Sequence, residues 1–162
     1  MFKYTIGVVS MLKQKLTLYK KKRDFSKTPE PKSGDSELSQ EFYNQIIREY
    51  KKKSLGVRPI YVIQQHHARR LHWDLRLEFN GVLRSWAVPK EPSTKEKRLA
   101  VETEDHPIEY SLFQGIIPQG NYGAGRVKIW DPGSFDPIKN EKKKITVDIK
   151  GKKLKGRYCL IN

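Results

Sequence analysis

Hydrophobic and polar residues alternate along most of the chain after Tyr61. Short runs with a two-residue period are separated by Gly, Pro and Asn, which is the pattern of β-strands joined by turns. No helical pattern interrupts these runs, so parallel β-α-β units are not expected. The pattern predicts a mainly β fold, a small and mostly antiparallel sheet that is closed or half-closed into a barrel. The expected strands are 60–65, 71–79, 82–88, 98–104, 126–131, 145–150 and 154–161.

The first third of the chain has a different pattern. Residues 15–34 are basic and rich in Pro, Ser and Lys, which favours an extended or loop conformation. Apolar residues then recur at helical spacing over 36–53, so an amphipathic helix is predicted there. A length of 162 residues suits one domain. The expected organisation is a leader over 1–15 and a single domain over 16–162, made of a basic arm with one or two short helices (16–56) and a barrel (57–162).

The strand expected at 71–79, with the sequence LHWDLRLEF, carries the densest group of ionisable residues. Its odd positions are all apolar and form a core face. Its even positions are His72, Asp74, Arg76 and Glu78, four different ionisable groups on the opposite face. A face that is merely solvated more often carries Lys, Thr, Ser or Gln. The row of polar residues therefore indicates a site.

A hairpin is expected directly after this strand. Asn80-Gly81 between two apolar runs is a strong signal for a two-residue turn. The residues facing Arg76 and Asp74 are then small, which would leave open space above the polar row. The predicted register places Leu83, Ser85 and Ala87 opposite Glu78, Arg76 and Asp74.

A metal site is one interpretation of the histidines near this strand. His66 precedes it in QQHHARRLH, and a short loop could fold His66 back toward His72 and Asp74. Two imidazoles and one carboxylate make a three-ligand set with open positions. Such a set suits Mn²⁺ or Zn²⁺ bound beside a phosphate, where the metal neutralises charge and activates or orients water. The His-x5-His-x-Asp spacing is equally compatible with histidines that only form hydrogen bonds in loops.

Further polar groups lie downstream. His106 and Tyr110, in DHPIEY, could supply a proton or bind phosphate oxygens. Arg76 could hold a phosphate in bidentate fashion. In the strand expected at 98–104, Glu102 and Glu104 fall in phase with His106, which would put these side chains on one face.

A glycine-rich run and a single cysteine are two further candidates for chemistry. The glycine-rich run 120–125 opens no predicted helix, so it is neither a dinucleotide-binding nor a P-loop motif. It is either a loop near the site or a plain turn. Cys159 falls in the last expected strand, where a buried, inert thiol is predicted. No Ser-His-Asp or Cys-His order stands out.

The net charge of +15 is unevenly distributed. Residues 1–60 carry 14 Lys and Arg against 6 Asp and Glu, residues 61–136 carry 10 of each, and residues 137–162 carry 9 against 2. All four histidines lie in the neutral middle. Basic flanks attract polyanions, and nucleic acid is the commonest such partner. The alternative is that the lysine-rich ends only keep a small protein in solution.

The compartment is expected to be the cytoplasm. A single cysteine rules out an internal disulfide framework and favours a reducing cytosol. The mildly apolar run 4–12 is too short and too polar to span a bilayer, so no membrane association is expected.

Three segments of the chain carry a family resemblance. They are YKKKRDFSKTPEP, QQHHARRLHWDLRLEFNGVLRSWAVPKEPS and RLAVETEDHPIEYSLFQGIIPQGNYGAGRVKIWDPGSF. Over about residues 16–160 the chain resembles the 3′-phosphoesterase domain of bacterial and archaeal end-joining DNA ligases of the ligase D type. The resemblance implies a small β-barrel with a polar crevice. It also implies a manganese-dependent enzyme that removes a 3′-terminal ribonucleoside and then hydrolyses the remaining 3′-phosphate to a 3′-hydroxyl.

The resemblance also implies roles for individual residues. His66, His72 and Asp74 match the metal ligands. Arg76, His106 and Tyr110 match phosphate-contacting or proton-transfer residues. The supporting residues of the site would be Arg23, Asp24, Glu30, Gln64, Lys90, Arg98 and Glu104.

The implied partners are 3′ ends of DNA or mixed DNA and RNA primer–templates in repair by non-homologous end joining. A DNA ligase, a polymerase or primase and Ku-type proteins would act in trans with a stand-alone, monomeric chain. The alternative function is a non-catalytic module that holds nucleic-acid ends for a separate ligase. The chain departs from the family pattern at His67, Glu91 and Gln119, and it lacks a last strand that many members add, so a less complete barrel is expected.

Overall fold

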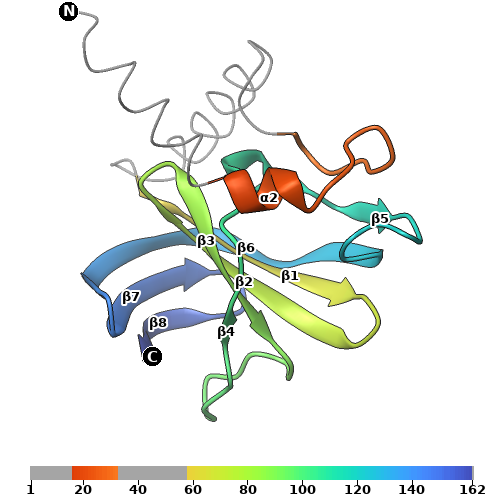
Figure 1. Cartoon of the computed structure of the whole chain (residues 1–162). Coiled ribbons are helices and arrows are strands. Elements are labelled where there is room, and N and C mark those ends of the chain that lie inside the picture. The colour runs from red at the N-terminus through yellow and green to blue at the C-terminus, as the bar shows by residue number, and fades with distance from the viewer. Residues whose placement is uncertain (1–15, 33–57, 162) are drawn as a thin grey trace, which may run out of the picture.

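The computed structural model describes residues 16–32 and 58–161, which form one short α-helix, a 3-10 helix and eight strands (Figure 1). The leader expected at 1–15 and the helix expected at 36–53 lie outside the described residues. No helix in the described ranges is long and apolar enough to cross a membrane. The elements are α2 (Thr17–Lys21), β1 (Ile60–His67), β2 (Leu71–Phe79), β3 (Val82–Val88), β4 (Val101–Glu102), η1 (Ile108–Leu112), β5 (Gly115–Ile117), β6 (Gly125–Glu141), β7 (Lys144–Gly151) and β8 (Lys155–Ile161).

All of these strands belong to one antiparallel sheet. The order is β4-β3-β2-β1-β6-β7-β8, and β5 pairs with β6 beside this path. The sheet curls, so that β7 and β8 cross one face of β1, β2 and β3 (Figure 1). The predicted mainly β, antiparallel, half-closed barrel is therefore confirmed.

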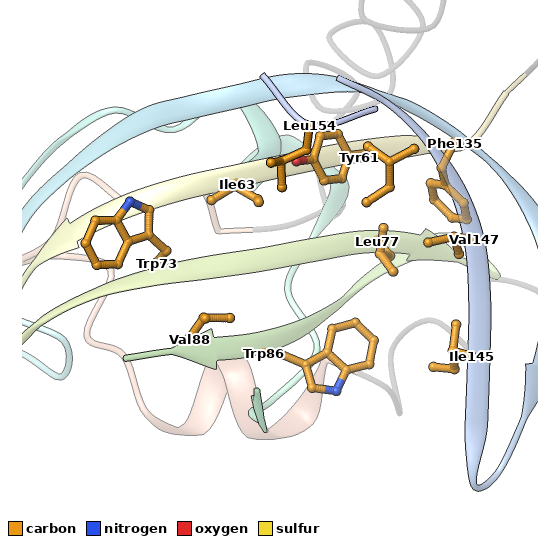
Figure 2. Close-up of a cluster of buried hydrophobic side chains, with 11 residues drawn as sticks. Tyr61, Ile63, Trp73, Leu77, Trp86, Val88, Phe135, Ile145, Val147 and Leu154 are labelled. Carbon is orange, nitrogen blue, oxygen red and sulfur yellow. The ribbon is translucent and has the colours of Figure 1, made fainter. Parts of the chain in front are cut away.

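The apolar face of the β1–β2–β3 layer looks into this curl. Trp73 and Leu77, two of the odd positions of β2, are buried there, as predicted. Across the curl, Val147 of β7 lies beside Leu77, as Figure 2 shows. The buried members of this cluster are Tyr61, Ile63, Trp73, Leu77, Trp86, Val88, Phe135, Ile145, Val147, Ile149 and Leu154.

The opposite face of the same layer is also buried. At one end it is covered by α2 and η1, whose Tyr19 and Tyr110 pack with Ile60 of β1 and Leu83 of β3. This second cover explains why β1 begins with consecutive apolar residues: both faces of the strand leave water. Further along the strands the face becomes polar, and this polar stretch is the crevice described below.

The hairpin between β2 and β3 has the predicted register. Asn80 and Gly81 have φ angles of 52° and 79°, the pair of positive values that a type I′ turn requires. As predicted, Leu83, Ser85 and Ala87 pair with Glu78, Arg76 and Asp74.

Several predicted boundaries were wrong. The strand predicted at 126–131 is β6, which runs through Asp131-Pro132-Gly133 instead of ending there. Gly133 marks a close approach of two strands, not a turn, because a Cβ there would lie 2.3 Å from the carbonyl oxygen of Lys150. Strand β5 was not predicted.

The N-terminal arm and the last strand also differ from the predictions. Residues 17–21 form α2 instead of a loop, because Leu16 and Tyr19 are buried against the sheet and tertiary packing stabilises this short helix. Cys159 is exposed on β8, the last strand of the sheet path, and is not the buried thiol expected.

The strand predicted at 98–104 is reduced to the two residues of β4 by an irregularity in pairing. Trp86 lies opposite Glu102, so an unbroken ladder would pair Leu83 with position 105; it pairs with His106 instead. This one-residue bulge leaves Glu102 on the Trp86 side, whereas Glu104 and His106 reach the crevice. The prediction that Glu102 shares their face was wrong.

Candidate active site

The centre of the crevice is a cluster of two histidines and an aspartate. His66 of β1 pairs directly with His72 of β2, and Gln64 pairs with Asp74, so all four side chains share one face. One ligand atom from each of His66, His72 and Asp74 lies within 4.8 Å of the others. His67 points to the other face and is exposed, so the histidine of this pair that joins the cluster is His66.

Backbone carbonyls fix the ring tautomers. His66 Nε2 lies 2.8 Å from the carbonyl oxygen of Gly123, and His72 Nδ1 lies 2.9 Å from that of Arg70. In a neutral imidazole, the ring nitrogen that faces a carbonyl carries the proton and donates it, which leaves the other nitrogen with a lone pair. Those nitrogens, Nδ1 of His66 and Nε2 of His72, lie 3.6 and 3.5 Å from the carboxylate oxygens of Asp74.

This arrangement fits a divalent metal ion. Two nitrogen lone pairs and a carboxylate face one point, and they repel one another unless a cation or a proton lies between them. Histidines that ligate metals commonly donate their second ring N–H to a carbonyl or carboxylate, as both histidines do here. The residues His66, His72 and Asp74 could therefore hold a metal ion, and the set of two imidazoles and one carboxylate suits Mn²⁺ or Zn²⁺.

Asp74 is held in its charged form. Burial opposes ionisation of its carboxyl most strongly. The positive charge of Arg76, whose Nη2 lies 3.2 Å from Asp74 Oδ2, and the interactions with His66 and His72 together outweigh burial and keep the pKa below its usual value. The carboxylate is thus in the state that a metal ligand requires.

Arg76 is buried and oriented by four groups. Its Nε donates to Gln64 Oε1 at 2.7 Å, its Nη1 to Ser85 Oγ at 2.9 Å and its Nη2 to Asp74, and its guanidinium carbon lies 4.6 Å from the centre of the Tyr110 ring. Ser85 therefore does not leave the open space predicted above Arg76; its hydroxyl is a partner of the guanidinium. These contacts leave the charge little freedom to move.

A second group of charges comes from the N-terminal arm. Arg23 Nε donates to Glu30 Oε1 at 2.8 Å, and its Nη1 to Glu104 Oε1 at 3.2 Å. Lys22 Nζ donates to Glu104 Oε2 at 2.9 Å and to Tyr122 Oη at 3.1 Å. The arm is therefore fastened into the crevice, and Arg23 is almost completely buried there.

His106 is a neutral imidazole. Burial lowers its pKa well below the usual value, and the charges of Arg76 and Arg23 lower it further. Its Nδ1 lies 2.8 Å from the Glu104 carbonyl oxygen and donates to it, so Nε2 can accept from Arg23 Nη2 at 3.3 Å. In this state His106 positions Arg23.

Tyr110 is a buried phenol. Burial raises its pKa, so the hydroxyl keeps its proton at neutral pH and donates to Glu30 Oε1 at 3.0 Å. Its carbonyl oxygen accepts from Gln64 Nε2 at 2.8 Å. Tyr110 thus links the arm to the strand that carries His66.

The structure brings most of the predicted site residues together, but not all. Asp24 is exposed and bonds to Ser26 in a turn, and Lys90 is exposed after β3. Arg98 bonds to the carbonyl of Glu91 and borders the apolar face of the sheet. The residues that the crevice gathers are Arg23, Glu30, Gln64, His66, His72, Asp74, Arg76, Glu104, His106 and Tyr110.

Sequence reasoning missed Lys22, Tyr122 and the roles of Ser85 and Gly123. The signal for Tyr122 and Gly123 is the glycine-rich run 120–125, whose sequence is compatible with a plain turn and with a loop near the site. The bond from His66 to the Gly123 carbonyl shows that it is a loop at the site.

The match of residues 64–162 to a family model decides the family. That model is described as the DNA Ligase D 3′-phosphoesterase domain. The chain belongs to this family.

It is 48% identical over 160 residues to the multifunctional non-homologous end joining protein LigD of Mycolicibacterium smegmatis, and 46% identical over 153 residues to the LigD of Pseudomonas aeruginosa. These alignments cover 91% and 90% of this chain but 19% and 16% of the relatives, so the chain spans less than a fifth of their length. A LigD of Mycobacterium tuberculosis, named as a DNA repair protein, is 44% identical over 153 residues and is covered to 18%.

Proposed function

We propose that this chain is a divalent-metal-dependent phosphoesterase that heals 3′ ends of primer strands during end-joining DNA repair. It removes a 3′-terminal ribonucleoside and then the 3′-phosphate, and it leaves a 3′-hydroxyl. Family membership supports the reaction class. The observation that carries the proposal is the pair of imidazoles, each fixed by a backbone carbonyl, whose free nitrogens face buried Asp74 beside Arg76.

The metal ligands in this proposal are His66, His72 and Asp74, and the preferred ion is Mn²⁺. A bound divalent cation supplies positive charge to a phosphate oxygen and lowers the pKa of a water nucleophile. The chain's own contribution is to hold three ligand atoms on one rigid pair of strands.

Arg76 is the proposed phosphate-binding residue closest to these ligands. Its guanidinium adjoins Asp74, so a phosphate bound at the metal ligands lies next to a fixed positive charge. A guanidinium that is already fixed in position stabilises a pentavalent transition state more than the mobile ammonium group of a lysine does. Arg23, held by His106 and Glu30, is the proposed second cation.

Tyr110 is the proposed proton donor or hydrogen-bond donor at the phosphate. It is a phenol with a raised pKa, and it lies between Arg76 and Glu30. His106 is a weaker candidate for the acid because it is neutral and its Nε2 already accepts from Arg23. We assign it a positioning role.

The proposed substrates are primer–template 3′ ends, and the proposed partners are a DNA ligase, a polymerase or primase and Ku-type proteins. The supporting observations are the basic character of the chain and the names of its relatives, which are end-joining proteins. The proposed setting is the cytoplasm, and the proposed active form is a monomer.

Hydrolysis of a 3′-phosphate from a primer–template, with Mn²⁺ and with EDTA, tests this function. The expected result is conversion to a 3′-hydroxyl in Mn²⁺ only, and loss of this activity in Asp74→Asn. Asp148→Asn, which removes a carboxylate of β7 bonded to Lys150, is the matched control and should retain activity. Turnover in EDTA would contradict the metal-dependent mechanism.

The second candidate is a non-catalytic module that holds nucleic-acid ends. The strongly basic composition favours it as much as it favours the enzyme. Binding of the primer–template with no turnover in either Mn²⁺ or EDTA would select this candidate and reject the enzyme.

A further inference from the structure

Tyr122 is an aromatic residue that is half exposed. It lies in the loop between β5 and β6, and 49% of its surface is accessible, whereas the ring residues Tyr19 and Tyr110 beside the crevice are buried. The next residue along the chain is Gly123, whose carbonyl fixes the His66 ring. Tyr122 is therefore the neighbour in sequence of the residue that fixes His66, and its ring lies against Lys22 and Arg23.

Two cations of the N-terminal arm lie near this ring. Lys22 Nζ is 4.5 Å from the ring centre and donates to the phenol oxygen at 3.1 Å, and the Arg23 guanidinium carbon is 5.6 Å from the ring centre. Lys22 is in turn held by Glu104. The orientation of the ring is thus fixed by charged groups, while half of its surface remains open to solvent.

The loop does not need the ring to keep its shape. Gly120 and Gly123 have φ angles of +86° and +74°, which glycine adopts without strain. Backbone bonds from Asn121 N to the Pro118 carbonyl and from Ala124 N to the Asn121 carbonyl close the turn. An exposed aromatic ring that the loop does not require, held beside two cations and a phosphoesterase site, has the features of a base-stacking platform.

We propose that Tyr122 is the specificity-determining residue that stacks on the base of the nucleotide carrying the scissile phosphate, and that Lys22 positions its ring. This inference rests on the proposed function and adds a subsite to it. In this proposal the base stacks on the exposed surface of the ring, and the terminal phosphate extends toward the residue pair His66 and Arg76. Stacking tolerates any base, so the subsite recognises a terminal nucleotide without reading its sequence.

Kinetics with two substrates test the subsite. One is a primer–template with a normal 3′-terminal nucleotide and a 3′-phosphate, and the other has an abasic sugar at the same place. Tyr122→Leu should raise KM about tenfold for the first substrate and leave kcat unchanged, because one stacked base contributes roughly that factor to binding. Tyr122→Phe keeps the ring and should raise KM less than Tyr122→Leu. On the abasic substrate the wild type and Tyr122→Leu should have the same KM.

A purely structural role for Tyr122 gives another result. If the ring served only to hold the loop and His66, Tyr122→Leu would lower kcat and Mn²⁺ affinity equally on both substrates. That outcome overturns the subsite. Ile138→Ala, which truncates an exposed apolar residue of β6, is the control for a surface change and should behave as the wild type on both.

Fluorescence of 2-aminopurine at the primer 3′ terminus tests stacking without turnover. Binding to the wild type and to Tyr122→Phe should quench the probe, and binding to Tyr122→Leu should not. Quenching that persists in Tyr122→Leu overturns the subsite even if the enzyme is active. Quenching that depends on Tyr122 in a protein without turnover supports the subsite and tells against the proposed function, so the two failures are distinguishable.

Discussion

Two buried carboxylates, Asp74 and Asp131, lie in different surroundings. Asp131 of β6 is completely buried and accepts four hydrogen bonds, from Tyr61 Oη at 2.9 Å and from three backbone N–H groups at 2.7 to 2.9 Å. Asp74 of β2 is 7% exposed and is faced by two imidazole nitrogens that carry lone pairs, with Arg76 on one side. The three N–H donors to Asp131 are those of Lys152, Lys153 and Leu154.

The difference shows which buried charge belongs to the fold and which to the site. Donors from one turn meet both oxygens of Asp131, so that carboxylate ties β6 to the β7–β8 connection and needs no further ligand. Asp74 faces two imidazole nitrogens beside Arg76, and a cation or a proton between these groups completes its surroundings. Burial alone does not separate the two; the kind of atom that faces each carboxylate does.

The largest predicted effect is on turnover in Asp74→Asn. The amide removes the negative ligand between His66 and His72, and we expect 3′-phosphate hydrolysis to fall by at least about 10³-fold, the scale of losing a principal electrostatic group. Arg76 loses an ion pair but keeps Gln64 and Ser85. The free energy of unfolding, measured in urea, should therefore change much less than the rate. An active, folded Asp74→Asn would remove this residue from the metal set.

Asp131→Asn should show the reverse pattern. Its amide NH₂ cannot accept from backbone N–H groups, so the free energy of unfolding should fall by about 3 kcal/mol, the cost of leaving buried donors unpaired beside a former charge. Urea denaturation followed by circular dichroism measures this loss. The folded protein should keep its kcat and its Mn²⁺ affinity. A folded variant with wild-type stability and no activity would invert the comparison.

Gly123→Ala tests whether the Gly123 carbonyl, which fixes the His66 ring, contributes to metal binding. The residue has a φ of +74°, so an alanine there strains the backbone by about 1 kcal/mol and turns the carbonyl away. We expect a roughly tenfold loss of Mn²⁺ affinity, as for other groups that orient metal ligands.

Gly120→Ala is its matched control. Gly120 has a φ of +86°, and a Cβ there would meet nothing within 4 Å, so the strain is similar but no histidine is affected. Both variants should lose similar stability, and only Gly123→Ala should lose metal affinity. Equal metal affinity in the two would show that the carbonyl does not orient His66.

The smallest predicted effect is the pH dependence of the stability that Glu104 contributes through its ion pairs with Lys22 and Arg23 of the arm. Burial opposes ionisation of this carboxyl, but hydrogen bonds from Lys22 and Arg23 outweigh it and lower the pKa from its usual 4.5. A lowered pKa in the folded state contributes stability that is fully present above pH 4.5 and is lost as the pH falls through the folded value. The stability difference between wild type and Glu104→Gln should therefore be constant near neutral pH and shrink under acid.

Urea unfolding at several pH values measures this difference. Glu141→Gln, whose side chain is exposed and pairs with Lys139, provides the baseline. If the difference in the free energy of unfolding between wild type and Glu104→Gln grew as the pH fell, the ion pairs of Glu104 would not stabilise the fold.

Strand β2 could be predicted from sequence because its pattern is local. Alternation alone separated Trp73 and Leu77 from Asp74 and Arg76, and Asn80-Gly81 set the register of the next strand. The predicted return of His66 toward β2 also needed only a short loop. These features depend on period and turn chemistry, which neighbouring residues determine.

The rest depended on contacts between distant segments. No local sequence pattern around Arg23 indicates that its side chain binds Glu104, which is 81 positions further along the chain. The bulge before His106 inserts one residue, so the side chains that follow it lie on the opposite face of the sheet from that expected by simple alternation. The long strand β6 continues through Pro132 and Gly133, and Gly133 allows a close approach of β6 to β7. Tertiary contacts override local propensity at each of these places.

Direct titration with Mn²⁺ tests the central claim most closely. Free Mn²⁺ is measured by electron paramagnetic resonance in wild type, Asp74→Asn and Asp131→Asn. Circular dichroism without urea verifies that each protein is folded. We predict one saturable site in the wild type, an affinity at least about 100-fold weaker in Asp74→Asn, and an unchanged affinity in folded Asp131→Asn. Equal Mn²⁺ binding by Asp74→Asn and the wild type would contradict the assignment of His66, His72 and Asp74 as the metal centre.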